Sequence, residues 1–240
     1  MDIKTFITTF RKAFGDTAPL PIAFGYSTVP AEEPRKIPRC LIGAISKVRN
    51  GNPLTLTAEN VKCGGGGFYT GMHELPEYVP TFVSGQEHYK QTPEMVMDYV
   101  QKLDMHVNEK PYLNFVRIDK LDSLDDVEAI LFWATPDILS GLTAWTFYDN
   151  NDMNAVLAPF GSGCASIVSL AIKENHEGGR HCFIGMLDPS ARPLVPKYEL
   201  TFTVPKCRFV EMLSTMKDSA LFQHAFSIIK KRINGEIQKD

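Results

Sequence analysis

One short segment, Val127–Ala134, most constrains what this chain can fold into, because it is apolar apart from Glu128. A strand of this kind is typically covered on both faces of its sheet. Thr135-Pro136-Asp137 follows directly and predicts a helix start, since proline is favoured in the first turn. The step from buried strand to helix predicts an α/β fold with a mixed, mostly parallel sheet flanked by helices.

Strand and helix patterns alternate along the rest of the chain. Strands are expected at Pro21–Tyr26, Leu54–Thr57, Leu113–Ile118, Ala155–Phe160, Cys182–Leu187 and Glu199–Val204. Helices are expected at Met1–Phe14, Cys40–Val48, Pro93–Leu103, from the end of the turn 161–165 to Lys173, and at Lys206–Met216 and Ser219–Ile233. Thr92 is the expected N-cap of the helix at Pro93–Leu103.

Two stretches of the chain, about 20–105 and 125–190, follow a similar order of elements. Each runs from a strand through a helix and a polar turn to a second strand, and then to a small-residue turn that contains a cysteine. This similarity suggests an internal duplication, followed by C-terminal helices at 206–234. Because no linker separates the halves, we expect residues 1–240 to form a single domain.

Charge and hydropathy exclude several classes of protein. The 25 basic and 28 acidic residues give a net charge of −3, which disfavours a dedicated nucleic-acid binder. No apolar run approaches the roughly 20 residues that cross a bilayer, so no membrane association is expected. Met1–Phe14 has helical spacing rather than the apolar core of a secretory signal. With five dispersed cysteines, the expected location is the reducing cytoplasm.

The run Cys63-Gly64-Gly65-Gly66-Gly67 is the most telling chemical feature of the sequence. Glycine loses more backbone freedom on folding than other residues, so four in a row need a structural reason. Free N–H groups at a helix start bind anions, and the same setting lowers the pKa of a cysteine. The alternative is a tight turn packed on the core, with Cys63 as a small buried apolar residue.

A second small-residue turn, Gly161-Ser162-Gly163-Cys164-Ala165, also lies between an expected strand and an expected helix. Ligands of open α/β sheets bind at the carboxyl ends of the strands, and Ser162 could donate a hydrogen bond there. The alternative is close packing of a helix on the sheet. Arg192 follows a later strand and could bind a carboxylate or phosphate, although a surface ion pair is the competing interpretation.

The motifs in combination resemble those of the domain of unknown function 169 family, found in archaea and bacteria. The resemblance rests on these segments, in chain order: Arg39-Cys40, Leu54–Asn60, Cys63-Gly64-Gly65-Gly66, Gly71, Gly163-Cys164-Ala165 and Val204-Pro205. It implies a site at Glu59, Asn60, Cys63, Gly64, Gly65, Cys164 and Ala165, and it implies no particular reaction. The six histidines show no metal-ligand spacing, so the sequence identifies neither a metal nor a cofactor.

Four functions compete at this point. The first is binding of a small anionic ligand or cofactor between Cys63–Gly67 and Gly161–Ala165, with Arg192 and the Glu59-Asn60 pair assisting. The second is a thiol-dependent redox enzyme that uses Cys63 and Cys164. The third is a metal or iron–sulfur protein with these cysteines as ligands, which needs further ligands. The fourth is an interaction module. The sequence leaves ligand identity and homo-oligomer formation open.

Overall fold

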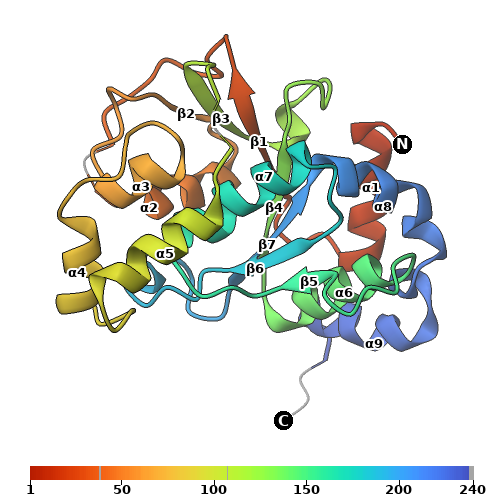
Figure 1. Cartoon of the computed structure of the whole chain (residues 1–240). Helices are drawn as coiled ribbons and strands as arrows, with labels where there is room; N and C mark the ends of the chain where they lie inside the picture. Colours follow the sequence, from red (N-terminus) through yellow and green to blue (C-terminus); the bar gives the residue numbers. More distant parts are fainter. Residues whose placement is uncertain (38, 107, 238–240) are drawn as a thin grey trace.

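A seven-stranded sheet forms the middle layer of the part described by this computed structural model, residues 1–37, 39–106 and 108–237. The strands are β1 (Ile22–Ser27), β2 (Leu54–Leu56), β3 (Tyr112–Arg117), β4 (Ala129–Ala134), β5 (Val156–Leu157), β6 (Cys182–Gly185) and β7 (Leu200–Pro205). They lie in the order β2-β3-β1-β4-β7-β6-β5 (Figure 1).

Helices cover both faces of this sheet (Figure 1). One face carries α1 (Ile3–Phe14), α6 (Pro136–Phe147), α8 (Lys206–Thr215) and α9 (His224–Ile233). The other face carries α2 (Leu41–Lys47), α3 (Gly64–Tyr69), α5 (Pro93–Leu103), the π-helical segment η3 (Ala165–Ser169) and α7 (Leu170–His176), while α4 (Val79–Gly85) packs on α5. Short 3-10 helices are η1 (Val48–Asn50), η2 (Ile118–Lys120), η4 (Arg192–Leu194), η5 (Met216–Asp218) and η6 (Ala220–Phe222).

The central strand β4 shows why the sheet needs helices on both sides. Ala129, Leu131 and Trp133 belong to the core beneath α2, α3 and α7. The residues between them, Ile130, Phe132 and Ala134, belong to the core beneath α1 and α6. Successive strand side chains point to opposite faces, so a strand that is apolar throughout must be buried from both sides.

The expectation of a mostly parallel sheet is wrong. β1–β3, β1–β4, β2–β3, β4–β7 and β6–β7 pair antiparallel, and β5–β6 is the parallel pair within the described residues. The apolar pattern of a strand records that both faces are covered, but it does not record the direction of the neighbouring strand. The connections also pass through several helices, which lets a strand return in either direction.

Local signals placed most elements well. α5 begins and ends as expected, and the Thr92 hydroxyl accepts a hydrogen bond from the Met95 N–H at 3.3 Å. β5 is shorter than the expected Ala155–Phe160 strand. Pro159 lacks the N–H that a longer ladder would need.

Every helix of the described residues is too short or too polar to cross a lipid bilayer.

The two halves suggested by the sequence occupy related places in the sheet. β1 and β4, which begin them, are neighbours at its centre, and β2 and β5 form its two edges. α3 follows β2 and η3 follows β5, so each cysteine-containing turn comes after an edge strand. The duplication itself remains a prediction.

Candidate functional site

A cavity of about 350 Å³ lies among the starts of α2, α3 and η3, the helices α4 and α5, and the segment after β6. Most of its wall is apolar or aromatic: Ile42, Tyr69, Tyr78, Val79, Phe82, Val83, Tyr89, Val96, Tyr99 and Phe160. Its polar side chains are Glu87, Lys90, Ser162, Asp188 and Ser190. This size and composition are typical of a small-molecule site.

Three cysteines from distant parts of the sequence line this cavity: Cys40, Cys63 and Cys164. Each stands immediately before a helical segment, at the starts of α2, α3 and η3 respectively. Cys63 and Cys164 were expected to share a cleft, and the structure places both in it. Cys40 was not among the expected site residues, although the Arg39-Cys40 motif was visible in the sequence.

The Cys63 sulfur receives hydrogen bonds from more than one direction. Cys63 is the N-cap of α3, and its sulfur accepts from the Gly66 N–H at an N–S distance of 3.4 Å. A hydrogen bond from the Cys40 thiol is the main reason that the pKa of Cys63 falls to about 6, with the N–H groups of Gly66 and Leu41 adding to it. Burial and the charge of Asp188 oppose this shift.

The pKa values of the other two cavity thiols, Cys40 and Cys164, are raised instead. Donation to Cys63, followed by burial, raises the pKa of Cys40. Burial raises the pKa of Cys164, whose side chain is almost inaccessible. A thiolate at neutral pH therefore belongs to Cys63, and Cys40 supplies the proton that stabilises it.

The glycine run forms the first turns of α3 rather than a left-handed turn, because none of Gly64–Gly67 has positive φ. Glycine is needed here because neighbouring side chains lie too close to the backbone to leave room for a Cβ. A Cβ on Gly64 would lie 2.6 Å from the Tyr78 hydroxyl oxygen, and one on Gly67 would lie 3.0 Å from Cγ of His73. A Cβ on Gly66 would lie 3.1 Å from Sγ of Cys63, whereas one on Gly65 would have open space within 4 Å.

The second small-residue turn is held by Asp188, which the sequence did not single out as a site residue. Its Oδ2 accepts from the Gly163 N–H at 3.0 Å, and its Oδ1 accepts from the Ser190 hydroxyl at 2.7 Å. A Cβ on Gly161 would lie 2.2 Å from the Tyr99 hydroxyl oxygen. The backbone of this turn, Gly161–Gly163, thus forms part of the cavity wall. Asp188 links the turn to the segment after β6.

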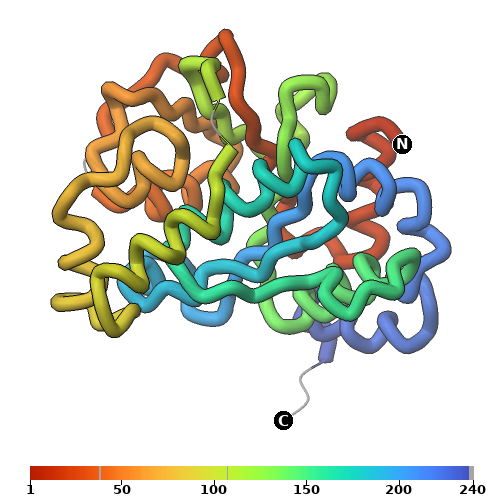
Figure 2. Tube along the Cα trace, viewed as in Figure 1, coloured from red at the N-terminus to blue at the C-terminus, as the bar shows by residue number. Residues whose placement is uncertain are grey.

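The segment between α4 and α5 contributes Glu87, Tyr89 and Lys90 to the cavity lining. Figure 2 shows this segment running beside the segment after β6. The Tyr89 hydroxyl accepts from the Ser190 N–H at 3.1 Å, and the Tyr89 ring lies 5.5 Å from that of Phe160. Lys90 lies over the Tyr99 ring at 5.3 Å. These aromatic residues carry no motif, so sequence reasoning had no signal for them.

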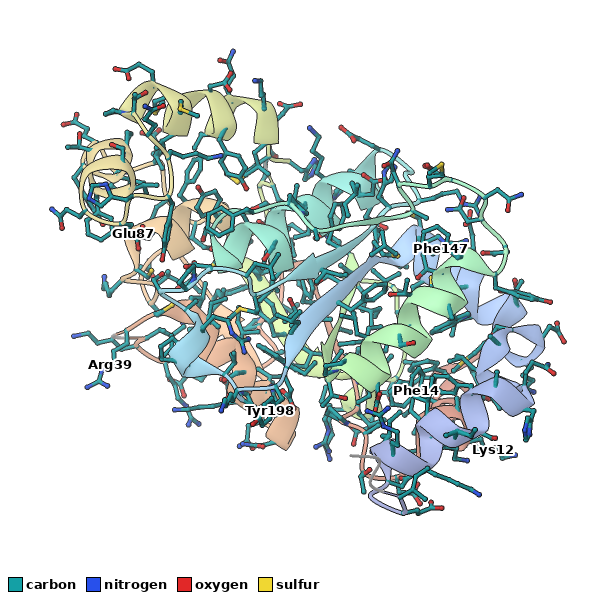
Figure 3. The ribbon with its side chains drawn as sticks, turned by 90° about the horizontal axis from the view of Figure 1, so that it is seen from below. Lys12, Phe14, Arg39, Glu87, Phe147 and Tyr198 are labelled. Atoms are coloured by element: carbon teal, nitrogen blue, oxygen red, sulfur yellow. The ribbon has the colours of Figure 1, made fainter. Side chains whose placement is uncertain are left out.

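Glu87 is another cavity residue that the sequence did not indicate. Burial, and then the charge of Asp188, raise its pKa above the ordinary value. Figure 3 shows Glu87 at the end of the molecule away from Lys12 and Phe14 of α1. The cavity is thus lined by two carboxylates, Glu87 and Asp188. Among the described residues, Lys90 is the one lysine that lines it.

Four residues expected to bind ligand lie outside the cavity lining: Glu59, Asn60, Gly67 and Arg192. Glu59 is exposed. The Asn60 amide closes its own turn, accepting from the Thr57 N–H and donating to the Thr55 carbonyl, each at 2.8 Å. The Arg192 guanidinium donates to the Lys197 carbonyl at 2.8 Å and also to the Glu199 carbonyl. Local backbone groups satisfy the Asn60 and Arg192 side chains, and ligand contacts by these four residues stay a prediction.

A metal centre has no preformed set of ligands in the part of the chain that the structure describes. No group of three or more His, Cys, Asp or Glu side chains there is arranged to hold a metal ion. The cavity cysteines are instead arranged as two half-buried thiols whose ionisation is linked, Cys40 and Cys63, beside a buried third thiol, Cys164.

Comparison with known proteins agrees with the motifs. No curated protein and no solved structure gives a significant match to the chain. The model of the DUF169 family, described as an uncharacterised ArCR, matches residues 14–215 and so includes every residue of the cavity wall. The chain belongs to the DUF169 family.

Proposed function

We propose that the chain binds a small, largely apolar molecule in this cavity and that Cys63, as a thiolate, reacts with an electrophilic atom of it. The observation that carries the proposal is the position of the Cys63 sulfur, with its pKa of about 6, at an aromatic wall. The thiolate is the nucleophilic form of cysteine, and a thiol at its ordinary pKa of about 8.5 is mostly protonated at neutral pH.

The lining favours an apolar ligand over the anionic ligand expected from the sequence. Arg192, the cation assigned to an anion, donates to backbone carbonyls elsewhere. Glu87 and Asp188 line the cavity against the single charge of Lys90. An anion would meet repulsion from both carboxylates and from the Cys63 thiolate, whereas a flat apolar group can stack on the rings of Tyr89, Tyr99 or Phe160.

Backbone N–H groups beside Cys63 support a nucleophilic role. The first N–H groups of a helix have no partner within the helix. Gly64 and Gly65 are the first residues of α3, and both line the cavity. Negative charge that develops on a ligand attacked by Cys63 would find these donors close to the reacting sulfur.

Alkylation kinetics test the proposal. The native protein is treated with N-phenylmaleimide, whose phenyl ring suits the cavity wall, and with iodoacetamide, and labelled cysteines are identified by peptide mapping. We expect Cys63 to react first with both reagents, and we expect its rate to saturate with N-phenylmaleimide because binding precedes reaction. Cys207, a half-buried thiol outside the cavity, is the internal control. Equal or slower labelling of Cys63 relative to Cys207 contradicts the proposal.

A further inference from the structure

Cys40 and Cys63 stand at the starts of α2 and α3, and both line the same cavity. A Cβ at Gly66 would lie 3.1 Å from Sγ of Cys63 and 3.3 Å from Cβ of Leu41, the residue after Cys40. The missing side chain at Gly66 therefore lets the starts of α2 and α3 come together. Both thiols are half-buried and both line the cavity, so a small molecule in the cavity can reach either sulfur.

We infer that Cys40 and Cys63 are a redox-active dithiol pair that reduces a low-molecular-weight disulfide bound in the cavity. This inference rests on the proposed nucleophilic role of Cys63 and adds Cys40 as the second reacting group. It replaces the pair of Cys63 and Cys164 that the sequence suggested. Cys164 also lines the cavity, but only 3% of its surface is exposed, so its sulfur is the less accessible partner.

The reaction balances with these two thiols and one disulfide, written RSSR. The Cys63 thiolate attacks one sulfur of RSSR, which forms the mixed disulfide Cys63–S–S–R and releases RS⁻. The Cys40 thiol then gives its proton to RS⁻ or to solvent and attacks Sγ of Cys63. The Cys40–Cys63 disulfide forms, the Cys63–S–S–R bond breaks, and a second RS⁻ leaves. Two electrons pass from the dithiol to RSSR, and an external thiol restores the dithiol.

The opposite pKa directions of the two thiols assign their order. The interaction with Cys40 is the main cause that lowers the pKa of Cys63, and the same interaction raises the pKa of Cys40, so Cys63 is the thiolate and Cys40 stays protonated until the first step is complete. Once Cys63 is in a mixed disulfide it carries no negative charge, so the main cause that raises the pKa of Cys40 disappears. Cys40 then ionises more readily and can attack, so the first step prepares the second.

The cavity limits the class of disulfide. A volume of about 350 Å³ with an aromatic wall accommodates a small molecule with a flat or apolar substituent. We therefore assign small aryl or alkyl disulfides, rather than protein disulfides, as substrates of this pair.

Stoichiometry with 4,4′-dithiodipyridine, a small aromatic disulfide, tests the inference. Equimolar reagent is added to the reduced full-length protein, the released thiopyridone is followed by absorbance, and the product is identified by intact mass and peptide mapping. For the wild type we expect two thiopyridones per reacted chain and a peptide that links Cys40 to Cys63. For Cys40→Ser we expect one thiopyridone and a stable mixed disulfide on Cys63. Cys207→Ser should behave as the wild type.

The outcomes separate this inference from the function on which it rests. A wild-type product that stays a mixed disulfide on Cys63, with Cys40 free, overturns the dithiol pair and leaves the nucleophilic role of Cys63 intact. A disulfide between Cys63 and Cys164 likewise overturns it. If no thiopyridone arises from Cys63, the proposed function fails as well. Because the linked peptide is sought in the wild type, the test holds even where a Cys40 variant does not fold.

Discussion

Asp188 Oδ2 accepts a hydrogen bond from the Gly163 N–H at 3.0 Å, and this bond joins the segment after β6 to the turn before η3. The charge of this carboxylate also acts on two thiols: it opposes the fall in the pKa of Cys63 that Cys40 causes, and it adds to burial in raising the pKa of Cys164. Asp188 therefore holds the cavity wall together and at the same time limits how acidic Cys63 becomes.

Asp188→Asn is expected to separate these two effects. The amide carries no charge, so the pKa of Cys63 should fall below about 6 and its alkylation below that pH should become faster. One of the acceptor positions used by Gly163 and Ser190 is lost, which should lower the free energy of unfolding by about 1 to 3 kcal/mol. The rate of Cys63 alkylation as a function of pH measures the change in pKa, and urea unfolding measures the change in stability. Slower alkylation at low pH would show that the Asp188 charge does not oppose the thiolate.

The pH profile of Cys63 alkylation follows from its lowered pKa. Since this pKa is about 6, the rate should rise as pH increases through 6 and reach a plateau well before the ordinary value of about 8.5. Cys40→Ala removes the main stabilising donor, so the midpoint of the profile should move to higher pH. If the midpoint rises by about one pH unit, the rate well below it should fall about tenfold. Cys207→Ala, outside the cavity, should leave the midpoint in place. An unchanged midpoint in Cys40→Ala would exclude Cys40 as the donor.

Gly65 and Gly66 form a matched pair of test positions in one helical turn. A Cβ at Gly66 meets Cys63 and the buried Leu41, so Gly66→Ala should slow Cys63 alkylation and cost about 1 to 3 kcal/mol of stability. A Cβ at Gly65 has open space, so Gly65→Ala should leave the rate of Cys63 alkylation unchanged. It should raise the free energy of unfolding by about 0.5 to 1 kcal/mol, because alanine is favoured over glycine in a helix. Thermal unfolding and alkylation of both variants decide this. Equal effects at the two positions would argue against close approach as the reason for glycine.

Arg192→Ala tests whether this arginine belongs to the binding site. Its guanidinium donates to the carbonyls of Lys197 and Glu199, so the substitution should lower the free energy of unfolding by about 1 to 3 kcal/mol. The rate and saturation of Cys63 labelling by N-phenylmaleimide should not change. If the folded variant needed more N-phenylmaleimide to saturate the labelling rate, Arg192 would belong to the binding site after all.

Several local features could be read from the sequence because their causes lie within a few residues. Thr92 and Pro93 define the start of α5, and the apolar pattern of Val127–Ala134 indicates a strand buried on both faces. Cys63 could be recognised as a candidate because a cysteine before a run of glycines is local as well. Asn60 belongs to a motif and Arg192 follows a strand, but local backbone groups bind both side chains.

The sequence by itself therefore determined where most of the helices and strands lie and that Cys63 and Cys164 stand beside small residues, because periodicity, caps and glycine runs act over short distances. It did not indicate α4, and the glycine run, expected as a turn, forms α3. Only the tertiary structure decided the antiparallel directions of the strands, the entry of Cys40 into the site and the aromatic wall around it. Strand direction depends on hydrogen bonds between segments far apart in the chain. Likewise, the thiol pair of Cys40 and Cys63 exists because two helix starts meet in space, which no local pattern encodes.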